Sequence, residues 1–174
     1  MKKLGIEFKW AVIFVLVSLA WMVLEKFVGL HGPHIDKHAI YTNLFAIPAI
    51  AVYIFALLEK RRNFYEGMMT YKQGFVTGVI ITMMVTVLAP LTQYITSAVI
   101  SPEYFPNVIN YTVREGTMTL PEAERYFTMG NYIIQSLIGT LVMGLITTAA
   151  VAFFTKRSAS QIRSEFAAGA GTAK

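Results

Sequence analysis

The sequence of 174 residues contains no cysteine. Disulfide frameworks, thiolate metal sites and cysteine nucleophiles are therefore excluded. Charged residues are also scarce, at 14% of the chain, whereas 55% of the residues are hydrophobic and the mean hydropathy is +0.53. Because soluble domains carry about 25% charged residues, this composition excludes an ordinary soluble globular enzyme.

The short motifs that mark common enzymes are missing as well. There is no Gly-x-Ser-x-Gly nucleophile elbow, no phosphate-binding P-loop and no His-Glu-x-x-His zinc motif. No cofactor is therefore expected. The net charge of +5 does not indicate nucleic-acid binding, because the basic residues cluster at the ends of apolar runs instead of forming a basic face or groove. The expected partner is the lipid bilayer.

What the chain has instead is long stretches without charge. Four intervals free of Asp, Glu, Lys and Arg cover more than half of the sequence: residues 10–24, 39–58, 73–102 and 126–155. A membrane-spanning helix needs about 20 mainly apolar residues. The pattern predicts an all-α polytopic membrane protein with four transmembrane helices, at about residues 10–30, 39–58, 73–100 and 131–154.

The four spans are expected to form one transmembrane domain over residues 1–157. The segment at residues 158–174 is expected to be a disordered cytoplasmic tail, because its small and polar residues cannot bury a core. Two prolines fall inside spans, Pro48 in the second and Pro90 in the third. They predict kinks or locally weakened hydrogen bonding.

The orientation follows from the distribution of the 15 Lys and Arg residues. The first and third loops together carry 4 of them: Lys26, Lys37, Arg114 and Arg125. The other 11 lie in the N-terminal segment, the second loop and the tail: Lys2, Lys3, Lys9, Lys60, Arg61, Arg62, Lys72, Lys156, Arg157, Arg163 and Lys174. The positive-inside rule then predicts that both termini are cytoplasmic.

The third loop, at residues 101–129, carries structure signals of its own. Thr119 and Glu122 fit a capping box at the start of a helix. A second short helix is predicted over residues 106–115, ending at Gly116. The loop is therefore expected to contain short helices at the outer membrane interface.

Ser101 is expected to cap the start of this loop, because Pro102 follows it. Aromatic residues are interspersed through the loop and the start of the fourth span: Tyr104, Phe105, Tyr111, Tyr126, Phe127 and Tyr132. They suit an aromatic belt that anchors the loop at the interface. A lid over a bound ligand is the alternative.

Glu25 is the most deeply placed carboxylate. The first uncharged interval is too short to cross a bilayer alone, so the first span has to include Glu25 and Lys26 at its outer end. Carboxylates inside membranes are functional candidates by default. Snorkelling towards the headgroups, or a structural polar bond to the first loop, is the favoured interpretation. No other charged residue is expected within a span.

The first loop carries three histidines, His31, His34 and His38. Imidazoles together with nearby carboxylates suit a metal such as zinc. Gly32 and Pro33 break any helix between His31 and His34, so the three rings need not converge. A structural or solvated loop is therefore favoured over a metal site.

Small residues recur every fourth position on the third and fourth spans. The two stripes are Gly74, Gly78, Thr82 and Thr86, and Thr140, Gly144, Thr148 and Ala152. Small residues at this spacing allow two helix backbones to approach closely. In antiparallel helices they predict three neighbouring pairs: Gly78 with Thr148, Thr82 with Gly144, and Thr86 with Thr140. A homodimer contact through one stripe is the alternative.

Polar residues also lie in the outer halves of the third and fourth spans. Gln93, Asn131 and Gln135, with Tyr94, could line a small outward-facing cavity, although such residues more often bond one another across helices. Together with the first loop, they define a candidate polar cluster of Glu25, His31, Gln93 and Gln135.

Three stretches resemble a known family. They are Glu-Lys-Phe-Val-Gly-Leu-His at residues 25–31, Tyr-Lys-Gln-Gly-Phe-Val-Thr-Gly at 71–78 and Ser-Pro-Glu-Tyr-Phe at 101–105. With the four-span layout, these are similar to the domain of unknown function 4199 (DUF4199) family of bacterial four-span membrane proteins. The resemblance covers about residues 4–157. It implies a bacterial cytoplasmic membrane location and supplies no activity.

The leading hypothesis is a non-enzymatic inner-membrane component that acts in accessory or assembly roles through helix packing and outer-loop contacts. Its partner would be another membrane protein or a second copy of the chain. The first alternative is a small transporter or channel component with an outward-facing polar vestibule. The second is a metal-dependent membrane enzyme that uses the histidine loop.

Overall fold

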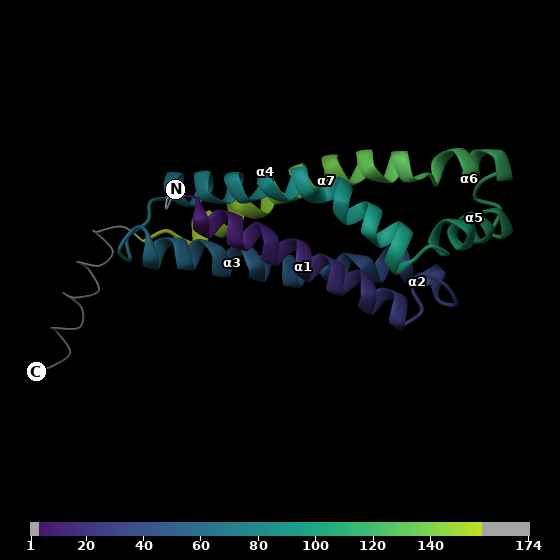
Figure 1. The fold of residues 1–174 in the computed structure, drawn as a ribbon, viewed down its shortest axis with the longest axis horizontal. Coiled ribbons are helices and arrows are strands. Elements are labelled where there is room, and N and C mark those ends of the chain that lie inside the picture. Colours follow the sequence, from purple (N-terminus) through teal and green to yellow (C-terminus); the bar gives the residue numbers. More distant parts are fainter. Residues whose placement is uncertain (1–3, 158–174) are drawn as a thin grey trace, which may run out of the picture.

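The computed structural model describes residues 4–157 of the chain. Its helices run along one long axis (Figure 1). They are α1 (Gly5–Phe27), α2 (Ile35–Tyr41), a 3₁₀ segment η1 (Thr42–Phe45), α3 (Ala46–Asn63), α4 (Tyr71–Ile95), a π-helical segment η2 (Thr96–Ile100), α5 (Tyr104–Arg114), α6 (Leu120–Tyr126) and α7 (Met129–Thr155). The only strand-like pairing among these residues is an isolated bridge between Met69 and Arg157.

Four helical segments are long and apolar enough to cross a membrane: Gly5–Phe27, Ile35–Asn63, Tyr71–Ile100 and Met129–Thr155. The predicted all-α, four-span fold is therefore confirmed. The predicted tail at residues 158–174 lies outside the described residues. Lys9 lies near the start of α1, and Lys60 and Arg61 lie near the end of α3. The end of the bundle where α1 starts and α3 ends is called the basic end below, and the opposite end, with α2, α5 and α6, is called the loop end (Figure 1).

The first span is shifted relative to its prediction. It begins at Gly5 and ends at Phe27, before the predicted limit at Leu30. The helix ends because Gly29 adopts a positive φ of 84°, which glycine reaches without steric cost. The amide of Leu30 then donates to the carbonyl of Glu25 at 2.9 Å and closes a tight turn.

The two prolines have different effects. Pro48 lies in the first turn of α3, where its missing N–H removes little helix hydrogen bonding, and the chain just before α3 is the 3₁₀ segment η1. Pro90 lies inside α4. In Figure 1, α4 runs beside α7 from the basic end and then bends away from it towards the loop end. A bend of this kind is the usual consequence of a proline within a helix.

The helix pair α4 and α7 forms the most extensive contact of the bundle. A Cβ atom placed on Gly78 would lie 2.5 Å from Thr148 Cγ2, and one on Gly144 would lie 2.5 Å from Thr82 Cγ2. These are two of the neighbouring pairs that the small-residue stripes predict. The pairing of Thr86 with Thr140 stays a prediction.

A hydrogen-bonded group of hydroxyls extends this contact to a third helix. The phenol of Tyr53 on α3 lies 2.8 Å from Thr82 Oγ1, which in turn lies 3.4 Å from Thr148 Oγ1. All three residues are buried. Their mutual bonds satisfy polar groups in a region where the bilayer offers no partners. Around them the core is apolar, with Ala56, Leu57, Ile81, Val85, Val151 and Ala152 among its members.

The expectation that no charged residue besides Glu25 and Lys26 lies within a span is wrong. Because α1 starts at Gly5 and α3 continues to Asn63, both helices include charged residues at the basic end. Lys60 Nζ lies 2.7 Å from Glu7 Oε1, and both side chains are almost fully buried. The more exposed Lys9 pairs with Glu59. Two ion pairs therefore join α1 to α3.

Adding a methyl group at Gly144 should destabilise the bundle. We expect Gly144→Ala to lower the free energy of unfolding by about 1–3 kcal/mol, because the new Cβ overlaps Thr82 and either this side chain or the two helices must shift. Gly139→Ala on the same helix is the matched control, since nothing lies within 4 Å of its Cβ position. Unfolding in mixed detergent micelles would measure both. Equal effects of the two variants would contradict close packing at Gly144.

The two ion pairs of the basic end should differ in strength. Glu7→Gln removes the carboxylate charge that lies 2.7 Å from the buried Lys60 ammonium, and we expect a loss of about 3–5 kcal/mol. Glu59→Gln makes the same chemical change at the exposed pair and should cost less than about 1 kcal/mol. Thermal unfolding in detergent at low salt compares them. A Glu7→Gln variant as stable as Glu59→Gln would show that the buried pair is not needed.

Candidate functional site

The candidate site is built around Glu25 at the loop end of α1. Glu25 is only 1% exposed, although it lies two residues before the last residue of the helix. Trp21, one turn earlier, donates its indole N–H to Glu25 Oε1 at 2.5 Å. The pair is a consequence of helix geometry, since residues four apart share a face. Glu25 therefore does not snorkel, and its carboxylate points into the protein.

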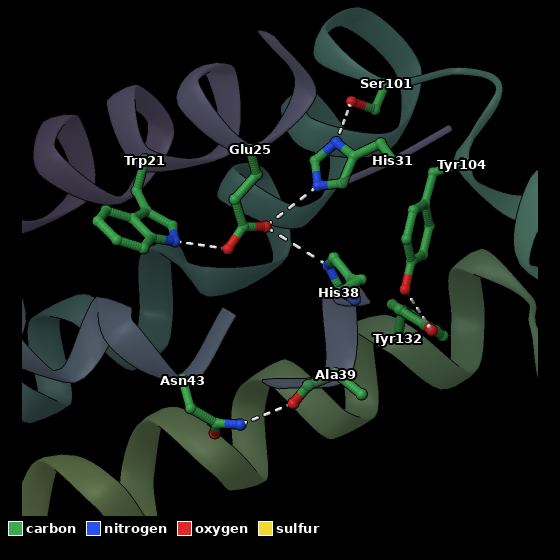
Figure 2. Close-up of polar contacts among 9 residues, drawn as sticks. All are labelled: Trp21, Glu25, His31, His38, Ala39, Asn43, Ser101, Tyr104 and Tyr132. Atoms are coloured by element: carbon green, nitrogen blue, oxygen red, sulfur yellow. Dashed lines mark hydrogen bonds and ion pairs between the residues drawn. The ribbon is translucent and has the colours of Figure 1, made fainter. Parts of the chain in front are cut away.

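Two histidines of the first loop meet the other carboxylate oxygen. His31 Nε2 lies 3.1 Å from Glu25 Oε2, and His38 Nε2 lies 3.4 Å from the same oxygen (Figure 2). The turn at Gly29 folds the chain back so that His31 faces the helix it has just left. His38 comes from α2, which starts after the Gly32-Pro33 break. Of the two favoured interpretations of Glu25, snorkelling or a polar bond to the first loop, this geometry corresponds to the polar bond.

The third loop supports the cluster from the opposite side. Ser101 Oγ lies 2.6 Å from His31 Nδ1, and Asn107 of α5 donates its side-chain amide to the His31 backbone carbonyl at 2.8 Å. Ser101 is therefore not the N-cap that its position before Pro102 suggested. Its hydroxyl is engaged with His31, and α5 begins after Glu103 without a side-chain cap.

Tyr104 covers the two imidazoles. Its ring centroid lies 5.3 Å from that of His31 and 5.2 Å from that of His38, and its hydroxyl lies 3.2 Å from the hydroxyl of Tyr132 on α7 (Figure 2). Burial raises the pKa of the Tyr104 phenol above its ordinary value, which further disfavours the phenolate form. Edge-to-face contacts also link Tyr104 to Phe105 and Phe105 to Tyr132. The aromatic residues expected to form an interfacial belt thus include a compact group of packed rings.

The donor atoms of Glu25, His31 and His38 all lie within 4.8 Å of one another. Two imidazoles and one carboxylate form a donor set that binds zinc and related divalent metals. The predicted metal set differed by one member, because it contained His34 instead of Glu25. His34 is exposed, and its ring faces the backbone turn at Gly29.

The candidate polar cluster of Glu25, His31, Gln93 and Gln135 is brought together only in part. Glu25 and His31 bond each other, whereas Gln93 donates to Ser97 on its own helix at 2.9 Å. Gln135 lies on the exposed surface of α7. Neither glutamine has a contact with Glu25 among the interactions described.

The expected outward-facing polar cavity also has a different character. Gln93 borders a cavity of about 400 Å³ between the helices, and its other lining residues are mainly apolar, with Phe14, Met22, Phe45, Val85 and Met143 among them. Asn131 instead donates to the backbone carbonyls of Arg125 and Tyr126, at 3.0 Å each. Asn131 therefore holds the connection from α6 to α7.

A second hollow lies at the loop end, beside the cluster. It has a volume of about 690 Å³ and is lined by the first loop and α5: Gly32, Pro33, Ile35, Asp36, Asn107, Asn110, Tyr111, Arg114 and Glu115. We call it the outer groove. A smaller hollow of about 240 Å³ reaches the cluster itself and is bordered by His31, Ser101 and Tyr104.

The sequence did not indicate Ser101 or Tyr104 as site residues, because they lie 70 or more positions from His31 and only the fold brings them near. Trp21 could have been found from its spacing of four residues before Glu25 on a helix. The capping box of Thr119 and Glu122 is confirmed by bonds of 2.9 and 2.7 Å from Thr119 to the Glu122 carboxylate. The sequence thus predicted hydrogen bonds between residues a few positions apart better than contacts between residues far apart in the chain.

Removing the Ser101 hydroxyl should weaken the loop end. We expect Ser101→Ala to cost about 1–3 kcal/mol of unfolding free energy, because the buried His31 Nδ1 loses its partner. Ser136→Ala is the control, since its hydroxyl bonds only to a carbonyl on the same helix, and it should change stability by about 0.5 kcal/mol or less. Thermal unfolding in detergent measures both. A neutral Ser101→Ala would contradict the role assigned to this contact.

Comparison with known proteins gives one match. No curated protein and no solved structure matches the chain. The family model described as "Protein of unknown function (DUF4199)" matches residues 9–157. This range includes Glu25, both histidines of the cluster and the third loop, and it covers most of the sequence. The chain therefore belongs to the DUF4199 family.

Proposed function

We propose that the protein is a non-enzymatic accessory or assembly component of a bacterial inner membrane, with both termini in the cytoplasm and the outer loops as its binding surface. The charge distribution supports this orientation, because 11 of the 15 Lys and Arg residues belong to the N-terminal segment, the second loop and the tail. The loop end of the bundle then faces away from the cytoplasm.

The middle of the bundle favours a non-conducting role. The charged residues of the described helices lie near the two ends, and between them Gly78, Thr82, Gly144 and Thr148 close the α4–α7 contact. The Tyr53 phenol is bonded to Thr82. An ion would find neither a charged ligand nor a continuous polar path there. A channel role is the less well supported alternative for this reason.

The observation that carries the proposal is the outer groove. It is a hollow of about 690 Å³ at the loop end, and its rim combines Asp36 on α2 with Arg114 at the end of α5 and Glu115 directly after it. Charges of both signs beside backbone and amide groups suit a polar segment of another protein. The groove is also held in place, since Asn107 lines it and binds the His31 carbonyl.

The apolar cavity beside Gln93 favours the second candidate, a transporter component. Its volume of about 400 Å³ suits a small apolar ligand, and Thr92, Gln93 and Thr96 provide a few polar groups on one wall. It lies among the spanning helices and not at the loop end. The two candidates therefore depend on different residues and can be separated by experiment.

Crosslinking in the membrane tests the accessory role. A photoreactive amino acid at Asn110, which is exposed in the outer groove, should give a discrete adduct with one partner protein. The same residue at Val87, 75% exposed on a spanning helix, is the control and should not give that adduct. Arg114→Glu should reduce the Asn110 adduct by about tenfold, which corresponds to about 1.4 kcal/mol.

Arg125→Glu makes the same charge reversal on α6, outside the groove, and should leave the Asn110 adduct unchanged. If Asn110 gives no adduct while the purified protein passes ions or solutes across liposomes, the transporter alternative is correct. If Arg114→Glu and Arg125→Glu reduced the yield of the Asn110 adduct equally, the groove would not be the binding surface. The adduct would then respond to the net charge of the protein alone.

A further inference from the structure

We propose that Glu25, His31 and His38 form a binding site for a divalent transition metal, with zinc as the best-fitting ion. The family match assigns no metal to this chain. The inference rests on the arrangement of three donor atoms and of the groups that hold them. It does not depend on the accessory role proposed above.

The first support is the spacing of the donor atoms. A tetrahedral zinc ion with bonds of about 2.0–2.1 Å has ligand atoms about 3.3–3.4 Å apart. Glu25 Oε2 lies 3.1 Å from His31 Nε2 and 3.4 Å from His38 Nε2. The third separation is also within 4.8 Å. Metal binding would bring the two imidazole nitrogens to this tetrahedral spacing.

The second support is the set of contacts to the remaining polar atoms of two ligands. Ser101 lies against His31 Nδ1, which leaves Nε2 aimed at the carboxylate, and Trp21 occupies Glu25 Oε1, which leaves Oε2 aimed at both imidazoles. Metal-binding histidines and carboxylates characteristically have such partners on their other polar atom. Figure 2 shows the three donor atoms facing one another from three segments of the chain.

The third support is the burial of the carboxylate. Glu25 is 1% exposed, and a buried carboxylate is costly unless a positive charge compensates it. Its described neighbours are Trp21, His31, His38 and Thr42. None of these carries a permanent positive charge. A divalent cation between Oε2 and the imidazole nitrogens provides that compensation directly.

The donor types select the ion. Imidazole nitrogen with one carboxylate oxygen favours zinc, cobalt, nickel or iron over magnesium and calcium, which prefer oxygen ligands only. Three protein ligands leave a fourth position, and a hollow of about 240 Å³, bordered by His31, Ser101 and Tyr104, lies beside one of the three ligands. Water or a partner's side chain can complete the coordination from that side.

The bound ion would join the end of α1 to both outer loops. His31 is already linked to the third loop through Ser101 and Asn107, and Asn107 lines the outer groove. Fixing His31 on a metal therefore fixes one wall of the groove. The site is best described as structural or regulatory, because its ligands lie inside the protein. The outer groove is larger than the hollow beside the site and is the surface that a partner would bind.

Metal titration of the full-length, tag-free protein in detergent tests the proposal. After treatment with a chelator, one Zn²⁺ per chain should bind, as measured by calorimetry and elemental analysis. Co²⁺ should give the intense visible absorption of a four-coordinate site, and Zn²⁺ should abolish it. Absence of the cobalt spectrum and of stoichiometric zinc in the wild-type protein would overturn the proposal without any variant.

Variants then locate the site. Glu25→Gln and His38→Gln should each weaken zinc binding by about 100-fold or more, and Ser101→Ala should weaken it by about 10–100-fold. His34→Ala is the matched control, because His34 belongs to the same loop but lies outside the cluster, and it should bind zinc as tightly as the wild type. Gel filtration confirms that each variant is folded. Unchanged binding in Glu25→Gln and His38→Gln, or an equal loss in His34→Ala, would refute the assignment.

Discussion

The loop end of this protein depends on one buried carboxylate. Glu25 receives the Trp21 indole on one oxygen and faces His31 and His38 with the other. Each contact belongs to a different segment, so the carboxylate joins α1 to the turn that follows it and to α2. Through Ser101, the same network reaches the third loop. In a low-dielectric setting these bonds are strong, and leaving any of the groups unpaired is correspondingly costly.

Each end of the bundle contains a buried carboxylate, and the two carboxylates have different partners. At the basic end a buried carboxylate, Glu7, meets a permanent cation, Lys60, and the pair holds α1 against α3. At the loop end Glu25 meets two imidazoles, whose nitrogens can also bind a metal ion. The first arrangement suits a fixed structural joint. The second offers donor atoms to an ion, and the metal site is proposed there for this reason.

Much of the fold could be read from the sequence. The uncharged intervals located all four spans, because a helix that crosses lipid must avoid charge over about 20 residues. The stripes of small residues indicated the neighbours of Gly78 and Gly144, since both follow from the helical repeat. The site was found less completely. His34 was grouped with His31 and His38 because it lies between them in sequence, whereas Glu25 provides the third donor in space.

The sequence by itself determined the number of spans, the register of α4 against α7, the capping box of Thr119 and Glu122 and the unusual depth of Glu25. These features depend on hydropathy and helical spacing, which are properties of neighbouring residues. Only the tertiary structure decided that Ser101, Asn107 and Tyr104 surround the histidines, that Glu7 pairs with Lys60, and that an outer groove exists. Such contacts join residues about 50 to 80 positions apart. The contacts at the loop end depend on the turn at Gly29 and on the path of the third loop. The pattern of neighbouring residues in the sequence does not specify which distant segments these bring together.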